Sequence, residues 1–218
     1  MIKIAPSVLA VDFTKLGEEI KSADDCGVDW HHLDIMDGHF VPNISFGPSL
    51  VKTINNISDI YLDVHLMLSE PEKYFDDFKN AGADAITFHI EVHPDPKENL
   101  QRIKDLGMHA GISLNPDAKA EQVIPYLQYC DLLLVMSVFP GFGGQSFIES
   151  SLETITACRK HIDENNLNCQ ISVDGGVGRE NAQRVVDAGA DVLVMGSAFY
   201  KSLERQKLVE FVHSIDRN

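Results

Sequence analysis

Two short segments of the sequence place histidine and aspartate at alternate positions. His32-Leu33-Asp34 and Asp63-Val64-His65 each set an imidazole and a carboxylate two residues apart. Residues i and i+2 of an extended strand point to the same side, so each pair would face one way. One such pair is more often a hydrogen-bonded core histidine beside a capping aspartate, so further residues have to decide whether these groups do chemistry.

A third apolar segment supplies a second candidate carboxylate. It ends Val173-Asp174-Gly175-Gly176. Two imidazoles and two carboxylates suit one borderline divalent ion, namely zinc, iron(II), manganese or cobalt. The predicted metal ligands are therefore His32, Asp34, His65 and Asp174. Asp63 shares the parity of His65 and could orient a ligand histidine. His31 has the opposite parity, and we expect it to pack outside the strands.

A competing pattern follows closely in the chain. His89-Ile90-Glu91-Val92-His93 also alternates ligand-type residues, and by spacing alone it rivals the first set. Pro94 comes next, and a residue before proline is restricted to extended or turn backbone, so we expect the alternation to break there. We interpret this segment as loop structure, with His89 beside a ligand.

Glycines cluster after three late apolar runs, in Pro140 to Gln145, Gly175 to Gly178 and Gly196-Ser197. Glycine lets backbone amides approach phosphate oxygens, and a following helix N-terminus adds favourable potential. Tight turns are the alternative explanation for any one glycine pair, but three such loops favour a phosphate site. The loop from 140 to 145 is long and glycine-hinged, so it could also act as a lid.

The elements that must position these residues alternate along the whole chain. Helical stretches with 3.6-residue periodicity, such as Thr14–Ala23, Pro71–Asn80, Ile148–His161 and Asn181–Ala188, separate short apolar runs. The runs are Ile2–Val8, Trp30–Asp34, Tyr61–Met67, Ala85–His89, His109–Leu114, Leu132–Met136, Gln170–Val173 and Val192–Met195. Eight such units predict a (β/α)8 barrel, read as one domain over residues 1–218.

The barrel explains where chemistry should occur, because its active site lies at the carboxyl ends of the strands. The runs that end near Asp34 and Asp174 are three of eight steps apart, so the two aspartates should approach the axis from nearly opposite sides. Gly27-Val28-Asp29, Gly82-Ala83-Asp84 and Gly189-Ala190-Asp191 repeat one helix-to-strand joint. An open doubly wound sheet would need a Gly-x-Gly-x-x-Gly after an early strand, and the first run instead ends Pro6-Ser7-Val8.

Composition limits the class of partner. The chain of 218 residues carries 18 basic and 33 acidic residues, a net charge of −15 that disfavours nucleic acid and anionic lipid. Its four cysteines form no Cys-x-x-Cys pair and are expected to be reduced thiols. No stretch approaches the roughly 20 apolar residues of a membrane span. We expect a cytoplasmic protein that binds a small molecule.

Several segments together resemble the ribulose-phosphate 3-epimerase family over essentially the whole chain. They are Ala5-Pro6-Ser7, the twelve residues from His32 to Asn43, Asp63 to Met67, Val135 to Gln145, and Val173 to Val177. The resemblance implies interconversion of D-ribulose 5-phosphate and D-xylulose 5-phosphate by a metal-dependent homo-oligomer. Phe139 departs from the polar or acidic residue usual before Pro-Gly-Phe-Gly-Gly, which puts lid packing and fine substrate preference in question.

The resemblance also implies roles for individual residues. Asp34 and Asp174 would be the catalytic acid and base, with Asp34 as acceptor and Asp174 as donor. Met36, Met67 and Met136 would flank the reacting carbons. The implied substrate contacts are Ser7, His65, Gly141, Phe142, Gly143, Gly144, Gly175, Gly176, Gly196 and Ser197.

Inverting a carbon next to a carbonyl requires a proton to leave one face and return to the other. A divalent ion on the substrate oxygens would stabilise the enediolate between these steps. We predict that Asp34 and Asp174 share about one proton, because two carboxylates facing one site disfavour double ionisation. The alternatives are an epimerase of a six-carbon ketose phosphate such as D-allulose 6-phosphate, and a non-catalytic phosphate-binding barrel.

Overall fold

Eight parallel strands line the centre of the computed structural model, which describes residues 1–93 and 95–217. Their order is β1-β8-β7-β6-β5-β4-β3-β2. The ring is completed between β2 and β1 by a parallel bridge of Ser7 with His32, whose backbone N–H donates to the carbonyl of Pro6 at 3.0 Å. The strands are β1 (Lys3–Ala5), β2 (Trp30–Met36), β3 (Tyr61–Met67), β4 (Ala85–His89), β5 (His109–Leu114), β6 (Leu132–Met136), β7 (Gln170–Asp174) and β8 (Val192–Val194).

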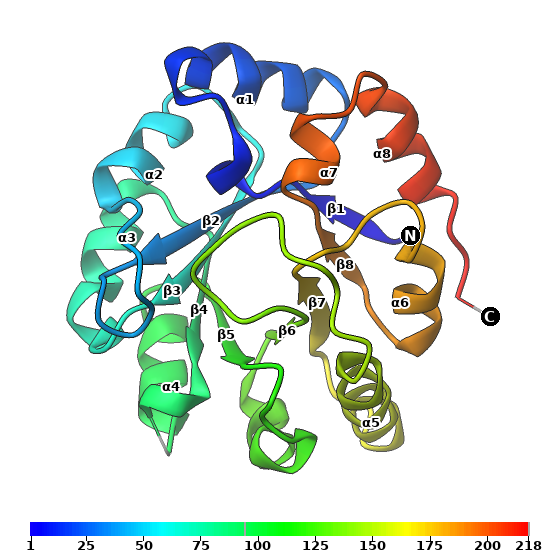
Figure 1. The fold of residues 1–218 in the computed structure, drawn as a ribbon. Coiled ribbons are helices and arrows are strands. Elements are labelled where there is room, and N and C mark those ends of the chain that lie inside the picture. Colours follow the sequence, from blue (N-terminus) through cyan, green and yellow to red (C-terminus); the bar gives the residue numbers. More distant parts are fainter. Residues whose placement is uncertain (94, 218) are drawn as a thin grey trace.

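Helices form an outer ring around these strands, which confirms the predicted (β/α)8 barrel (Figure 1). The α-helices are α1 (Leu16–Asp25), α2 (Pro48–Asn55), α3 (Phe75–Ala81), α4 (Lys97–Asp105), α5 (Ser151–Glu164), α6 (Ala182–Ala188), α7 (Ser197–Tyr200) and α8 (Arg205–His213). The 3-10 helices are η1 (Val8–Ala10), η2 (Phe13–Lys15), η3 (Pro71–Tyr74), η4 (Ile90–Val92), η5 (Ala120–Gln122) and η6 (Ile124–Tyr129). The β5–β6 connection uses only η5 and η6 in place of an α-helix.

The observed strand bounds differ from the predicted ones at five ends, one of which is the start of β1 at Lys3 instead of Ile2. β1 stops at Ala5, because the chain turns into η1 after the isolated bridge of Ser7. β2 continues to Met36 and β7 to Asp174, while β8 stops at Val194. The expected proline turn at Pro94 lies outside the described residues.

The three Gly-x-Asp joints share one structural role. Gly27, Gly82 and Gly189 all have positive φ, as a left-handed helix stop requires. The aspartate two residues later caps the start of the neighbouring strand. Asp29 accepts from Ile4 N–H, Asp84 from Leu62 N–H and Asp191 from Ile171 N–H, each at 2.8 Å. The joint thus satisfies a backbone donor at the amino end of the barrel.

Two apolar regions hold the wall in place. The larger lies between strands and helices, where side chains such as Leu33, Ile86 and Phe78 are buried. A smaller one fills the barrel interior with Ala5, Trp30, Leu132, Leu134, Met136, Val138, Val192 and Val194. None of the helices in residues 1–93 and 95–217 combines the length and apolarity that crossing a bilayer demands.

Candidate active site

The register of β2 against β3 brings the two alternating segments together. His32 lies beside Asp63, Asp34 beside His65, and Met36 beside Met67. On the far side of the barrel, Met136 of β6 lies beside Asp174 at the end of β7. His31 points the other way and contacts Asp24 of α1, with Nε2 2.7 Å from Oδ1, as its parity predicted.

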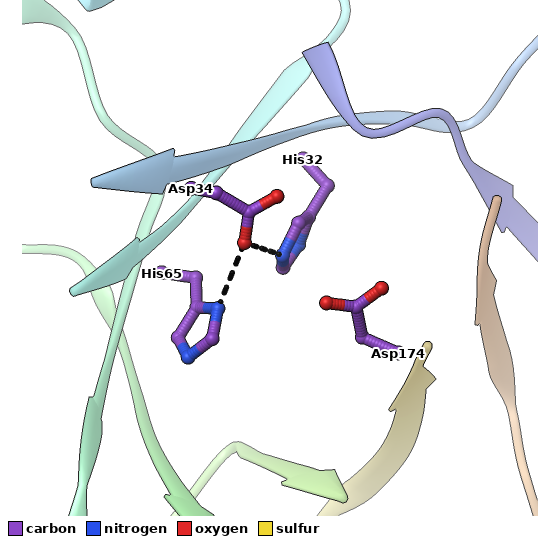
Figure 2. Close-up of side chains that lie close together, drawn as sticks. All are labelled: His32, Asp34, His65 and Asp174. Atoms are coloured by element: carbon purple, nitrogen blue, oxygen red, sulfur yellow. Dashed lines mark hydrogen bonds and ion pairs between the residues drawn. The ribbon is translucent and has the colours of Figure 1, made fainter. Parts of the chain in front are cut away.

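Four side chains from three strands converge at the carboxyl end of the barrel. One ligand atom from each of His32, Asp34, His65 and Asp174 lies within 4.8 Å of the other three. Figure 2 shows Asp174 facing the other three residues from across the barrel. Two imidazoles and two carboxylates form a mixed nitrogen and oxygen donor set that fits a borderline divalent cation. The set therefore qualifies as a candidate metal centre.

Neighbouring side chains hold the β2 residues in place. The Ser7 hydroxyl donates to Asp34 Oδ2 at 2.6 Å, and Asp34 Oδ1 lies 3.2 Å from His32 Nε2 and 3.0 Å from His65 Nδ1. Asp63, fully buried, contacts His32 Nδ1 through Oδ2 at 2.8 Å. The orienting contact expected of Asp63 is therefore present. Because a carboxylate only accepts, Asp63 keeps the proton on His32 Nδ1 and leaves Nε2 directed at the candidate metal centre.

The two candidate catalytic carboxyls have opposite pKa shifts. Burial alone would raise the pKa of Asp34, but the charge of His32 and hydrogen bonds from His32 and His65 outweigh it and hold that pKa well below its usual value. Burial, reinforced by the nearby charge of Asp34, raises the pKa of Asp174 to about 7. Near neutral pH Asp34 is therefore ionised, and the one proton that the pair can hold lies on Asp174, which is about half protonated at pH 7.

The two histidines also differ. Burial opposes protonation of His32, yet the adjacent carboxylates of Asp34 and Asp63 outweigh burial and raise the pKa of His32 well above its ordinary value. A cation bound at Nε2 would displace the proton there and leave the Nδ1 proton donated to Asp63. Burial lowers the pKa of His65 to about 4, even though Asp34 acts in the opposite direction. His65 is accordingly a neutral imidazole, the form in which histidine binds a metal.

A cavity of about 350 Å³ opens directly above these groups. Asp34 and Asp174 form part of its wall, together with Met36, Met67 and Met136. It is also lined by the predicted contact residues Ser7, Gly141, Phe142, Gly143, Gly144, Gly175, Gly176, Gly196 and Ser197. His65 is fully buried and is absent from the lining among the described residues, so its substrate contact stays a prediction.

The glycine loops pack closely over this cavity. Gly176 has a φ of +62°, and a Cβ there would lie 2.4 Å from the backbone nitrogen of Phe147. Only glycine therefore allows the β7 loop to pass the β6 loop at this point. The β6 loop, yellow-green in Figure 1, crosses the centre of the ring of strands. Asn43 Nδ2 donates to its Gly141 carbonyl at 2.7 Å, which ties it to the β2 loop.

Phe139, the residue that departs from the family pattern, lies in the same β6 loop. Its side chain is 51% exposed, and its carbonyl accepts from Gln145 Nε2 at 2.7 Å. The same nitrogen donates to the carbonyl of Phe142 at 2.8 Å. The loop is thus braced through backbone atoms, which do not depend on the side chain at 139.

The competing alternation at 89 to 93 does not form a second ligand set. β4 ends at His89 and η4 begins at Ile90, so the period-2 pattern stops there. His89 Nε2 lies 2.9 Å from His65 Nε2, as expected for a residue beside a ligand. His93 instead contacts Glu72, with Nε2 2.9 Å from Oε2.

One residue of the cavity was not anticipated. Lys201 is the single basic side chain among the described lining residues. It follows Ser197 by four positions, so the two share one face of α7 and its extension. That spacing, read with the glycine cluster at 196, was the signal that could have identified it.

Comparison with known proteins places the site in context. Residues 3–200 match the model of the "Ribulose-phosphate 3 epimerase family". A ribulose-phosphate 3-epimerase of Synechocystis sp. is 49% identical over 92% of this chain and 88% of its own. One from Bacillus subtilis is 45% identical over 96% and 97%. The 3-hexulose-6-phosphate synthase of Salmonella typhimurium, 16% identical, superposes over 98% of both chains with a TM-score of 0.74 and thus shares the fold.

Proposed function

The chain belongs to the ribulose-phosphate 3-epimerase family, and from that premise we propose that it interconverts D-ribulose 5-phosphate and D-xylulose 5-phosphate by two-base proton transfer at C3. The observation that carries the proposal is the pair Asp34 and Asp174. Both residues line one cavity, and their strands are three steps apart in the barrel. The pKa of Asp34 is lowered and that of Asp174 is raised. A one-base site would not need a second, proton-bearing carboxyl on the opposite side.

The protonation states support a direction for each carboxyl. Asp34 is the ionised group, so it accepts the C3 proton of ribulose 5-phosphate. Ser7 donates to Asp34 Oδ2 and keeps that carboxylate in one orientation. Asp174, whose pKa lies near 7, carries the proton that is returned to the other face. In the reverse direction the two residues exchange roles.

His32, Asp34, His65 and Asp174 would hold the divalent cation, which we propose to be zinc, iron(II), manganese or cobalt. When bound, such an ion supplies positive charge that stabilises the negative charge developing on the substrate oxygens. The three methionines give the cavity an apolar wall that excludes water from the reacting carbons. The Ser7 hydroxyl gives its hydrogen to Asp34, and its oxygen can still accept a hydrogen bond from a substrate hydroxyl in the cavity.

The phosphate group is proposed to bind at the glycine loops after β6, β7 and β8. Gly176, Gly196 and Ser197 lie on the cavity wall and bring backbone amides to it. Binding there fixes the sugar relative to the two carboxyls and contributes remote binding energy to the chemical step. We also propose that residues 1–218 are one domain, since one sheet takes up strands from Lys3 to Val194 and α8 contacts β1.

The direct test is a coupled assay that follows formation of xylulose 5-phosphate from ribulose 5-phosphate. We expect turnover with this pair to exceed turnover with allulose 6-phosphate, because relatives that are 45% and 49% identical over most of the chain are ribulose-phosphate 3-epimerases. Higher kcat/KM with the six-carbon substrate would favour the alternative epimerase. No turnover of either substrate by metal-loaded protein would favour the non-catalytic barrel.

Replacing Lys201 by methionine is expected to weaken substrate binding and to lower turnover by a smaller factor. Lys201 is a local cation in a chain of net charge −15 and should attract the substrate phosphate. An exposed charge pair contributes about 1 kcal/mol, or roughly a fivefold rise in KM. The measurement is KM and kcat at low and high ionic strength, with the larger effect expected at low salt.

Lys207→Met is the matched control for this substitution. Lys207 makes an exposed ion pair with Glu204 and is not among the described residues that line the cavity. Its replacement by methionine changes the net charge by the same amount as Lys201→Met. An equal rise of KM in both variants would assign the effect to overall charge and reject a local role for Lys201.

A further inference from the structure

Three side chains form a row that leads away from the candidate metal centre. His65 Nε2 lies 2.9 Å from His89 Nε2, and His89 Nδ1 lies 3.2 Å from Glu91 Oε2. The two imidazole rings stack with centroids 5.0 Å apart. Both histidines are fully buried, and the proton transfer described above uses neither His89 nor Glu91.

The positions of hydrogens in this row follow from its two ends. His65 Nδ1 is the nitrogen on the Asp34 side, at 3.0 Å from Oδ1, and donates to that carboxylate until a cation takes the place of the proton. Cation binding requires the Nδ1 lone pair, so in the loaded site the proton of His65 must lie on its other nitrogen. His65 Nε2 then carries the proton and donates to His89 Nε2. A neutral imidazole that accepts at Nε2 carries its own proton on Nδ1, which here faces the carboxylate of Glu91.

Glu91 is well placed to impose this arrangement. Its second oxygen, Oε1, accepts from the backbone N–H of Asn115 at 2.7 Å, just after β5. Burial would raise the pKa of Glu91, but the hydrogen bonds from His89 and from the backbone of Asn115 help to hold it below its usual value. Phe40 of the β2 loop packs against His89 with ring centroids 4.6 Å apart. Contacts from the loops after β2 and β5 therefore hold His89 and Glu91 in place.

We propose that Glu91 and His89 are positioning residues that hold His65 in the tautomer whose Nδ1 lone pair faces the metal. The inference rests on the proposed metal site. The tautomer of His32 is set by a single residue, since Asp63 contacts its Nδ1 and leaves Nε2 for the cation. His65 binds through the opposite nitrogen and needs a relay of two residues to reach a carboxylate.

Glu91→Gln tests the relay with a change of almost no volume. Glu91 uses one oxygen for Asn115 N–H and the other for His89 Nδ1–H, and a glutamine offers an acceptor on only one of these two sides. If the bond to Asn115 is kept, the amide NH₂ faces His89 and favours the wrong tautomer in both rings. We expect zinc and cobalt(II) affinity to fall about 10- to 100-fold. Competition with a chelator measures the affinity, and the visible spectrum of the cobalt(II) protein should change.

Glu72→Gln is the matched control, because Glu72 forms a similar pair with His93 that does not contact His65. The zinc affinity of the Glu72→Gln protein should stay within about twofold of the wild type, since Glu72 lies outside the relay. Glu91→Asp restores a second acceptor oxygen and should recover part of the lost affinity. Wild-type affinity and an unchanged cobalt(II) spectrum in Glu91→Gln would overturn the relay. Failure of the wild type itself to bind zinc or cobalt(II) would instead reject the proposed metal site.

A measurement on the unmodified protein covers the case in which Glu91→Gln does not fold. Nitrogen-15 NMR of the zinc-loaded protein assigns the protonated nitrogen of each imidazole. The relay requires the proton on Nε2 of His65 and on Nδ1 of His89. Finding either proton on the other nitrogen contradicts it.

Discussion

Asp174→Asn is expected to lower epimerisation by about 10³-fold or more while leaving one half of the proton exchange intact. The asparagine amide cannot return a proton to the substrate. Asp34 keeps its ionised carboxylate and its hydrogen bond from Ser7, so it can still remove the C3 proton of ribulose 5-phosphate. That proton should exchange with solvent although no xylulose 5-phosphate forms.

Deuterium oxide makes this asymmetry measurable by NMR. With Asp174→Asn, the C3 hydrogen of ribulose 5-phosphate should be replaced by deuterium, and that of xylulose 5-phosphate should remain. Asp34→Asn should give the mirror result. Wild-type turnover in either variant, or equal exchange of both substrates, contradicts the two-base scheme.

Asp63→Asn controls for the loss of a buried carboxylate near the cation. Asp63 contacts His32 and does not line the cavity in the described residues. Its replacement should slow exchange of both substrates to the same extent, because it acts through the metal ligand and not on one face of the sugar. Metal content is measured in every variant, since Asp174 is also a proposed ligand.

Removal of the divalent ion with a chelator is expected to reduce turnover by about 10³-fold or more, since charge stabilisation at the developing oxyanion is a large part of the barrier reduction. One equivalent of zinc, iron(II), manganese or cobalt should restore it. Magnesium and calcium should restore less, because they prefer all-oxygen ligand sets and this one has two imidazoles. The readouts are activity against added metal and elemental analysis of metal per chain.

Two histidine variants separate the metal site from a general effect of losing an imidazole. His65→Gln should bind zinc more weakly and recover little activity. His213→Gln removes an imidazole of α8 from a partly exposed pair with Asp29, which lies in the joint between α1 and β2, and should behave like the wild type. Full activity of protein shown to be free of metal would reject the cation requirement.

Much of the site could be predicted because strand periodicity is a local property. A period of two put His32, Asp34 and Met36 on one face, and eight apolar runs required a barrel whose strand ends meet at one mouth. The glycine joints were equally local, since a left-handed helix stop depends on the residue itself. The capping role of the aspartates in those joints was not predicted. Asp131 caps Ala110 N–H at 2.9 Å without a preceding glycine.

Other features depended on contacts between distant segments. The sequence predicted that the alternation from His89 to His93 breaks and that His89 lies beside a ligand, but the contacts of Glu91 with His89 and with Asn115 were not predicted, because they depend on how β4 packs against β5. Lys201 became part of the cavity through the path of the chain after β8.

The unequal pKa values of Asp34 and Asp174 were likewise outside the reach of the sequence. The two residues are the same amino acid at the ends of two strands. Asp34 receives a hydrogen bond from Ser7 and contacts two imidazoles, which lower its pKa. Burial and the charge of Asp34 raise the pKa of Asp174. Residue type and spacing determine which groups can face the barrel mouth. Proton affinity depends on the few ångströms between each group and its neighbours, and only the register and loop packing of the folded chain set those distances.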